Sequence, residues 1–123
     1  MLHSGIFKTA VFFGLSGVIL GAFAAHGLHD KISPVYLEAW KTGVQYQFYH
    51  TFTLLFISLA SNVWSEKQLT RAAWFFITGI LLFSGSLYLL AITSMYHLDL
   101  AKIGILTPVG GLFFMAGWIS YFF

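Results

Sequence analysis

The sequence predicts an all-α membrane protein, a four-transmembrane-helix bundle with a short interfacial helix before the second helix. Two observations support this fold class. The 123 residues are 59% hydrophobic and only 8% charged, whereas a soluble domain is roughly a quarter charged. The charges also fall in short stretches, and four long segments carry none. Since a span needs roughly 20 apolar residues, each of these segments can hold one transmembrane helix.

The uncharged segments follow Lys8, Lys41, Arg71 and Lys102. They place the four spans at approximately residues 6–25, 44–63, 72–94 and 104–123 of a single transmembrane domain, 1–123. In lipid the backbone must satisfy its own hydrogen bonds, which favours helices. The pattern therefore predicts a multi-pass protein of the cell membrane.

The first span carries small residues at three- and four-residue steps, namely Gly14, Gly17 and Gly21. They form a smooth face for close packing against another helix, either the fourth helix or a second subunit. Lys8 and an apolar core would also suit a signal peptide. Three further spans follow, so we interpret this segment as a transmembrane helix.

The link to the second span contains Ser33 followed by Pro34, the pattern of a helix cap and a first-turn proline. It predicts a helix at about residues 34–43, placed at the membrane interface by Tyr36 and Trp40. We expect this helix to bend at Gly43 into the second span.

Thr107 and Pro108 interrupt the fourth apolar segment. Either a helix starts here with Thr107 as its cap, or a longer helix kinks near Gly104. Gly110 and Gly111 then allow close helix packing. The alternative is a broken helix whose first amides bind an anion inside the membrane.

Charge and cysteine content exclude several classes of function. The net charge of +2 comes from scattered residues, so nothing suggests nucleic-acid binding. Cysteine is absent, which excludes disulfides and thiolate chemistry. Membrane orientation stays open, because three basic residues lie on each side: Lys8, Lys67 and Arg71 against Lys31, Lys41 and Lys102.

The second span begins with polar residues, in the stretch VQYQFYHT. Gln47 and His50 share one helix face by their spacing, with Tyr46 on its flank. His50 would lie roughly 9 Å inside the span at helical rise. We expect His26, at the end of the first span, to lie at nearly the same level. An ionisable residue at such depth is a functional candidate.

Four interpretations of these polar residues compete. The first is a proton or ion path through His50 and His26. The second is a metal site formed by His26, His29, Asp30 and His50, but Gly27 makes the required helical histidine pair doubtful. The third is a headgroup, quinone or other amphipathic ligand bound by His50 and Gln47. The fourth is hydrogen bonding between helices. We expect no metal, no cofactor and no enzymatic activity, since no catalytic triad or phosphate loop is present.

The segments GAFAAHGL, YLEAWKTGVQYQFYH, FSGSLYLLAITS and ILTPVGG resemble, in order and spacing, the domain of unknown function 423 family. This family includes the YwdK- and YgdD-like small bacterial membrane proteins, and the eukaryotic transmembrane protein 256 is similar. The resemblance covers nearly the whole chain and includes the motif TxxQYxxYH from Thr42 to His50. Ala24 stands where glycine is usual. The resemblance implies a four-span protein of the bacterial cytoplasmic membrane and supplies no activity.

These observations predict a non-enzymatic membrane subunit that self-associates or joins a larger complex and contacts membrane lipids. A pocket near His26 and His50 would bind a lipid-like or amphipathic ligand. The alternative is a small oligomeric transporter or channel for protons or ions, lined by His50, Gln47 and Tyr46. The candidate ligand or motif residues are His26, Gln45, Tyr46, Gln47, Tyr49, His50 and Thr107, and the candidate packing residues are Gly14, Gly17, Gly21, Gly110 and Gly111.

Overall fold

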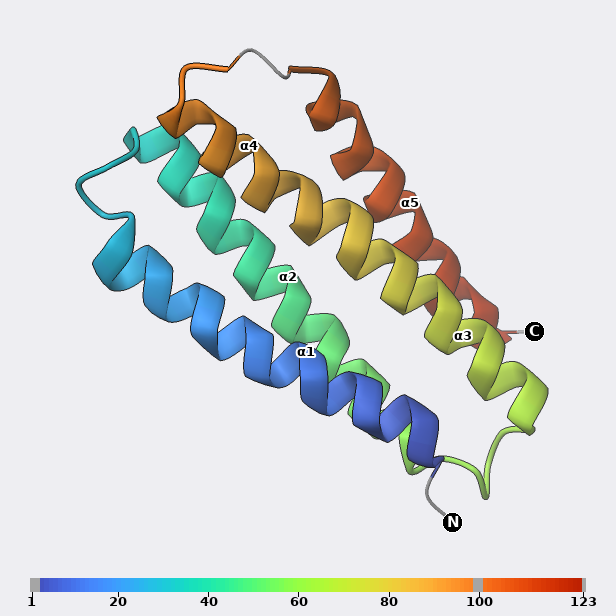
Figure 1. The fold of residues 1–123 in the computed structure, drawn as a ribbon. Coiled ribbons are helices and arrows are strands. Elements are labelled where there is room, and N and C mark those ends of the chain that lie inside the picture. The colour runs from blue at the N-terminus through green and yellow to red at the C-terminus, as the bar shows by residue number, and fades with distance from the viewer. Residues whose placement is uncertain (1–2, 99–100, 123) are drawn as a thin grey trace.

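A computed structural model describes residues 3–98 and 101–122, and these form four antiparallel helical rods (Figure 1). The first rod is α1 (Ser4–Ala22) with the π-helical segment η1 (Phe23–Gly27), and the second is α2 (Pro34–Ser58). The third joins α3 (Glu66–Gly79), the π-helical η2 (Ile80–Ser84) and α4 (Gly85–Met95). The fourth joins the 3₁₀ segment η3 (Ala101–Ile105), α5 (Leu106–Ile119) and the 3₁₀ segment η4 (Ser120–Phe122). The described residues contain no strand, which confirms the all-α class.

Three of the rods are long and apolar enough to cross a membrane: Ser4–Gly27, Glu66–Met95 and Lys102–Ile119. The second rod, α2, has 25 residues, or roughly 37 Å at helical rise. It is long enough to span, but it is not among the candidate spans. Four helical rods are therefore present, and the fourth membrane crossing stays a prediction.

The expected separate interfacial helix at residues 34–43 is wrong, because α2 runs without a break from Pro34 to Ser58. Gly43 has no left-handed backbone angle. It serves packing instead: a Cβ there would lie 2.9 Å from Cε1 of Tyr88. The helix also ends at Ser58, five residues before the expected end at 63, and residues 61–64 form turns. Pro34 opens the helix as expected, but the Ser33 side chain makes no capping bond.

The third rod begins earlier than the apolar pattern indicates, at Glu66 instead of residue 72. A capping box explains this start, since the Ser65 hydroxyl accepts from the Gln68 amide while the Gln68 side chain accepts from the Ser65 amide. The fourth rod enters through η3, and α5 starts at Leu106. Pro108 therefore lies in the first turn of a helix, and Thr107 is not its cap.

Small residues of α1 face α2 and not the fourth rod. A Cβ at Gly17 would lie 2.9 Å from Cζ of Phe48, and one at Gly21 would lie 3.6 Å from Val44. A Cβ at Gly14 would be in ordinary contact with Thr51. The two rods follow each other in the chain and lie side by side (Figure 1). The smooth face therefore packs within this hairpin, with Gly17 buried and Gly14 and Gly21 half-buried.

The fourth rod packs on the third through glycines that receive phenylalanine rings. The ring of Phe114 lies against Gly79, and the ring of Phe76 lies against Gly117. Gly110 lies against backbone instead of a ring, since a Cβ there would be 2.3 Å from the backbone nitrogen of Phe83. By contrast, a Cβ at Gly111 would lie 3.9 Å from Phe83. Gly110 is thus the essential member of the predicted glycine pair.

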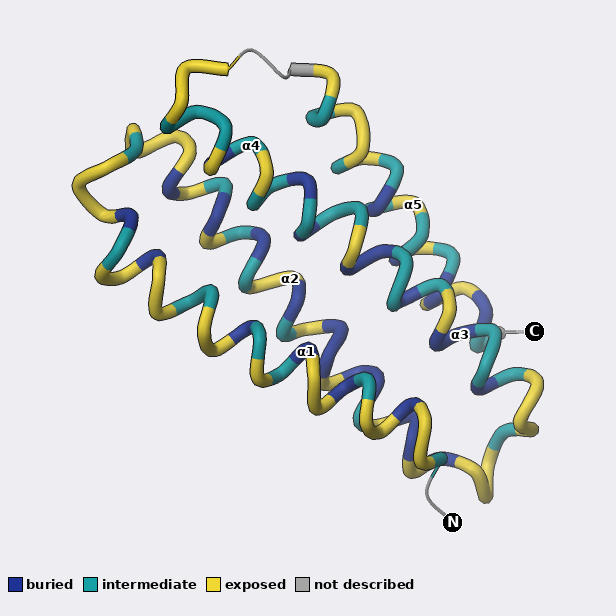
Figure 2. Tube along the Cα trace, in the orientation of Figure 1, coloured by how far each residue is buried: buried dark blue, intermediate teal, exposed yellow. Residues whose placement is uncertain are grey.

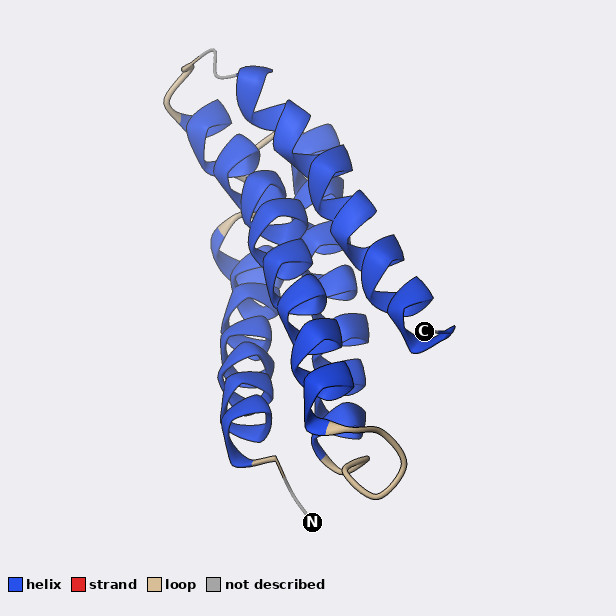
Figure 3. Cartoon of the chain, turned by 90° about the vertical axis from the view of Figure 1, so that its right-hand side faces the viewer, coloured by secondary structure: helices blue, strands red, loops and turns tan. Residues whose placement is uncertain are grey.

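Buried residues lie along the inner sides of the rods (Figure 2). The larger core cluster surrounds Phe76, Leu54 and Ile57, which are fully buried. A second cluster surrounds Trp40 near the η1 end. Turned by 90°, the structure shows the fourth rod set to one side of the others, with the N- and C-terminal ends of the chain at the same end of the rods (Figure 3).

We expect Gly110→Ala to lower the free energy of unfolding in detergent by about 1–3 kcal/mol, because backbone atoms of Phe83 cannot move aside. The matched control is Gly85→Ala, where a Cβ meets nothing within 4 Å. Thermal unfolding of both variants checks this. Equal melting temperatures would show that α5 does not pack on η2 in this way.

Candidate functional site

The motif residues of α2 divide between two faces of the helix. Gln47 and His50 are buried, whereas Gln45, Tyr46 and Tyr49 are exposed. Spacing accounts for the pairs Gln47–His50 and Gln45–Tyr49, because residues three and four apart share a helix face. Tyr46 is four residues before His50 and lies at the border of the two faces, with its ring beside Phe83. The inner and outer groups are therefore candidates for different roles.

Gln47 connects three rods with one side chain, and it is only 2% exposed. Its amide nitrogen donates to the Phe13 carbonyl at 2.8 Å and to the Ser16 hydroxyl at 3.0 Å, both on α1. Its amide oxygen accepts from the Tyr88 hydroxyl of α4 at 2.7 Å. Both amide hydrogens are thus used inside the protein.

Two further bonds fasten α2 beside Gln47. The Ser84 hydroxyl donates to the Gly43 carbonyl at 2.6 Å, which joins the third rod to α2. The Trp40 indole donates to the Leu20 carbonyl at 2.8 Å, which joins α2 to α1. The Tyr88 ring fills the space between these two bonds, 4.7 Å from Trp40 between ring centroids.

His50 connects α2 to the fourth rod. Its ring stacks on Phe114, with centroids 3.6 Å apart and planes 4° apart. Nδ1 lies 2.8 Å from the Tyr46 carbonyl, and Nε2 lies 3.3 Å from the Trp118 indole nitrogen. A carbonyl only accepts and an indole N–H only donates. The partners therefore assign the neutral tautomer with its proton on Nδ1.

The outward group is open to the surroundings of the protein. The Gln45 amide donates to the Tyr49 hydroxyl one turn along the same helix. The Tyr46 ring lies 4.6 Å from Phe83 and 5.7 Å from Tyr49 between centroids. An amide and two phenols thus form an exposed polar and aromatic strip on α2.

His26 and His50 do not meet, contrary to the expectation that they lie at one level. Gly21 lies beside Val44, and the two helices run in opposite directions away from this contact. His26 is five residues past Gly21 and His50 six past Val44, which separates them by roughly 16 Å at helical rise. His26 is exposed and borders a shallow hollow of about 490 Å³ with Ile19, Ala22, Phe23 and Gly27.

Thr107 contacts the third rod, and its hydroxyl lies 2.5 Å from the Ser86 hydroxyl. This places it among the helix-fastening bonds and away from both histidines. His29 lies 3.1 Å from Asp30 in an exposed pair. The part of the chain that the structure describes contains no group of three or more residues arranged to hold a metal ion.

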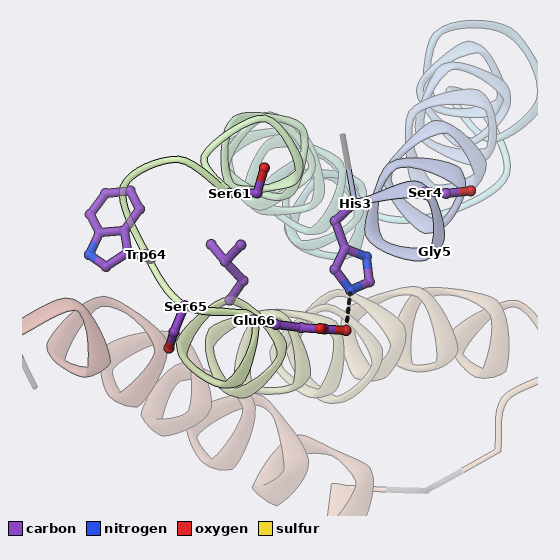
Figure 4. Close-up of a pocket in the computed structure, with 8 residues that line it drawn as sticks. His3, Ser4, Gly5, Ser61, Trp64, Ser65 and Glu66 are labelled. Atoms are coloured by element: carbon purple, nitrogen blue, oxygen red, sulfur yellow. Dashed lines mark ion pairs between the residues drawn. The ribbon is translucent and has the colours of Figure 1, made fainter. Parts of the chain in front are cut away.

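A cavity of about 460 Å³ lies where α1 and α3 begin, and sequence reasoning missed it (Figure 4). His3 borders it. Its backbone amide donates to the Ser58 carbonyl at 2.7 Å, and its Nδ1 accepts from the Ile6 amide at 3.3 Å. Nε2 points to the Glu66 carboxylate at 3.9 Å. A polar residue just before the first apolar segment was the available signal, since such residues cap helices.

An apolar groove of about 470 Å³ lies between α2 and the end of the fourth rod. Its lining residues are Phe52, Thr53, Phe56, Trp64, Trp118 and Tyr121. Near its end, the Tyr121 hydroxyl and the Arg71 Nε are buried without a hydrogen-bond partner among the described residues. We have no physical account of these two groups. The Arg71 Nη2 donates to the Ser120 carbonyl at 3.0 Å.

The apolar rods and the internal polar bonds define a helical membrane protein. The chain belongs to the family described as "Protein of unknown function (DUF423)", whose model matches residues 20–111. This confirms the resemblance identified from the motifs.

Curated relatives are bacterial and carry the name of membrane proteins. The "UPF0382 membrane protein YwdK" of Bacillus subtilis is 44% identical over 106 residues, which cover 85% of this chain and 82% of the relative. A Staphylococcus haemolyticus relative is 43% identical over 80% of this chain and 76% of its own length. A Haemophilus influenzae relative is 41% identical over 87% and 82%. No solved structure matches.

We expect Gln47→Leu to lower the free energy of unfolding by about 1–2 kcal/mol, because it removes three bonds and leaves the Tyr88 hydroxyl without its acceptor. Tyr88→Phe should cost less. The double variant should be more stable than the sum of the single effects predicts. Strict additivity in a double-mutant cycle would contradict the hydrogen bond between Gln47 and Tyr88.

The His50 tautomer is directly measurable. Nitrogen NMR of ring-labelled histidine should show a protonated Nδ1 and an unprotonated Nε2, since Tyr46 accepts and Trp118 donates. Trp118→Phe should change the Nε2 signal and leave Nδ1 protonated. A protonated Nε2 in the unsubstituted protein would mean that the indole contact does not form.

Proposed function

We propose that this protein is a four-span, non-enzymatic subunit of the bacterial cytoplasmic membrane. It acts by association, either with further copies of itself or within a larger membrane complex, and it contacts lipids. One observation supports this most strongly. The eight buried polar residues of the described part all form internal hydrogen bonds through their side chains, and among the buried side-chain atoms there only the Tyr121 hydroxyl and the Arg71 Nε have no partner. The eight are Gln47, His50, Thr51, Thr53, Ser58, Ser84, Ser86 and Ser120.

The packing of α2 supports the fourth span. Near one end the His3 amide bonds to Ser58, and towards the other end Trp40 bonds to Leu20. The helix therefore lies beside α1 along its length. If α1 spans the membrane, α2 spans it too. The polar side chains in the middle of α2, Gln47 and His50 above all, are buried among the neighbouring rods. Buried polar groups do not prevent a helix from spanning when its neighbours satisfy them.

The bonding of Gln47 and His50 supports a role other than catalysis. A catalytic group must reach a proton or a reacting atom of its substrate. Both nitrogens of His50 and both amide hydrogens of Gln47 already serve other parts of the protein. These side chains hold the rods in register.

The lipid-like ligand fits at the surface near His26 better than in a pocket between two histidines. The hollow beside His26 has an apolar floor of Ile19, Ala22 and Phe23 with an imidazole at its edge. A polar edge over an apolar floor suits a molecule with a headgroup and a chain. His50 takes no part in this site.

The transporter alternative has less support. Tyr46 is exposed while Gln47 and His50 are buried and bonded. The three side chains therefore do not line one path through a single chain. In an oligomer, a path between copies would meet Tyr46, whereas Gln47 and His50 are buried and already bonded within the chain.

Purification in a mild detergent followed by native mass spectrometry tests the proposal. In the mass spectrum we expect at least two copies of the chain, a partner protein or a retained lipid. When the protein is reconstituted into liposomes, we expect no ion or proton flux above that of empty liposomes. His26→Ala should reduce the retained lipid without changing the melting temperature. The control is His97→Asn, since His97 is exposed and asparagine tolerates its positive φ. A lipid-free monomer of unchanged stability, or a specific flux, would overturn the proposal.

A further inference from the structure

We propose that the outward side of α2 is the contact surface for a second copy of this chain. We call the side chains of Gln45, Tyr49, Phe52 and Phe56 the α2 outer face. The inference rests on the self-association in the proposed function, and it adds which surface is used and how the two copies recognise each other.

The α2 outer face is one continuous ridge. Its residues recur at steps of four, three and four, so they lie in line on one side of the helix. Tyr49 is 51% exposed, and Phe52 and Phe56 are each 61% exposed. Three aromatic rings therefore project from the protein over about two helical turns, with the amide of Gln45 at one end.

The outer faces of the flanking rods differ in chemistry from this ridge. On α1 the most exposed side chains in the middle of the helix include Leu15 and Val18, and on α5 they include Leu112 and Met115. Such side chains match lipid tails and need no partner. On α2 an amide and a phenol lie among the exposed groups. This difference from α1 and α5 indicates that another protein molecule covers the outward side of α2.

Hydrogen-bond chemistry indicates what covers it. Gln45 uses one amide hydrogen on the Tyr49 hydroxyl. Among the described residues nothing else bonds to its amide oxygen, its second amide hydrogen or the Tyr49 hydroxyl hydrogen. Lipid tails offer neither donors nor acceptors, so these groups are costly where hydrocarbon covers them. An amide is complementary to another amide, and a second copy supplies donor and acceptor together.

The groove between α2 and the fourth rod provides the shape for such a contact. Phe52 and Phe56 form one wall of this groove and belong to the ridge as well. Trp118 and Tyr121 form the other wall. A ridge directly beside a groove of similar chemistry can pack twice around a two-fold axis, with each ridge in the groove of the other copy. This is the self-complementary arrangement that closed dimers require.

The two-fold arrangement makes a sharp test available, because the chain contains no cysteine. Phe52 lies in the middle of the face, so its two copies should come within reach of a short cross-linker. We expect Phe52→Cys in native membranes to form dimers with a short bis-maleimide. Leu15→Cys and Leu112→Cys are the matched controls, because they are as exposed but lie on α1 and α5. They should stay monomeric.

A second variant tests the hydrogen bonds without cysteine. Gln45→Leu should weaken dimerisation roughly five- to tenfold, the effect of losing about one or two interhelical bonds. Its exposed position leaves the fold unchanged, so the melting temperature in detergent should match that of the unsubstituted protein. Dimer fraction as a function of protein-to-lipid ratio measures the change.

The outcomes separate this inference from the proposed function. Cross-linking at residue 15 or 112 but not at 52, with two copies still present by mass, overturns the α2 outer face and leaves self-association standing. A chain that stays monomeric in membranes and has no other partner overturns both. Loss of a bound lipid from Gln45→Leu with no change in copy number assigns the face to lipid and overturns the inference.

Discussion

One turn of α2, from Gln47 to His50, joins all the rods of the structure. Gln47 bonds to α1 on one side and to α4 on the other. His50 stacks on Phe114 of α5 and accepts a bond from Trp118. In a membrane the burial of apolar side chains does little to hold helices together, because lipid tails are equally apolar. The relative positions of the rods therefore depend on these few polar contacts and on close packing.

Close packing at glycines also holds the rods together, in addition to the polar bonds. On the α1 side the glycine face receives Phe48 and Val44, and on the α5 side Gly117 and Gly110 receive Phe76 and the backbone of η2. These contacts bring helices near enough for dispersion forces, which act only at short range. They also bring donor and acceptor groups into reach. The Ser84 hydroxyl meets the Gly43 carbonyl because Gly43 has no side chain to keep the third rod away.

The number of rods could be predicted from sequence, because charged residues are costly in hydrocarbon and so separate the long apolar segments. Their ends could not, since the third rod begins at Glu66, where a capping box starts the helix before the apolar residues do. The separate helix before α2 could not be judged in the same way. Gly43 is compatible with a hinge or with close packing, and only its contact with Tyr88 decides between them. The levels of His26 and His50 depend on how α1 pairs with α2. Sequence spacing within one helix contains no such information, so the expected meeting of the two histidines was wrong.

The polar character of α2 follows from its position among the rods. A helix with lipid on several sides must be apolar there, whereas a helix surrounded by protein can carry polar groups that its neighbours satisfy. On its inner side α2 meets this condition through α1, the third rod and the fourth rod. On its outer side Gln45 bonds to Tyr49, and among the described residues these two side chains have no further hydrogen-bond partner. If a second copy covers that side, the same condition holds all around the helix, and α2 becomes the centre of the assembly as it is already the centre of the chain.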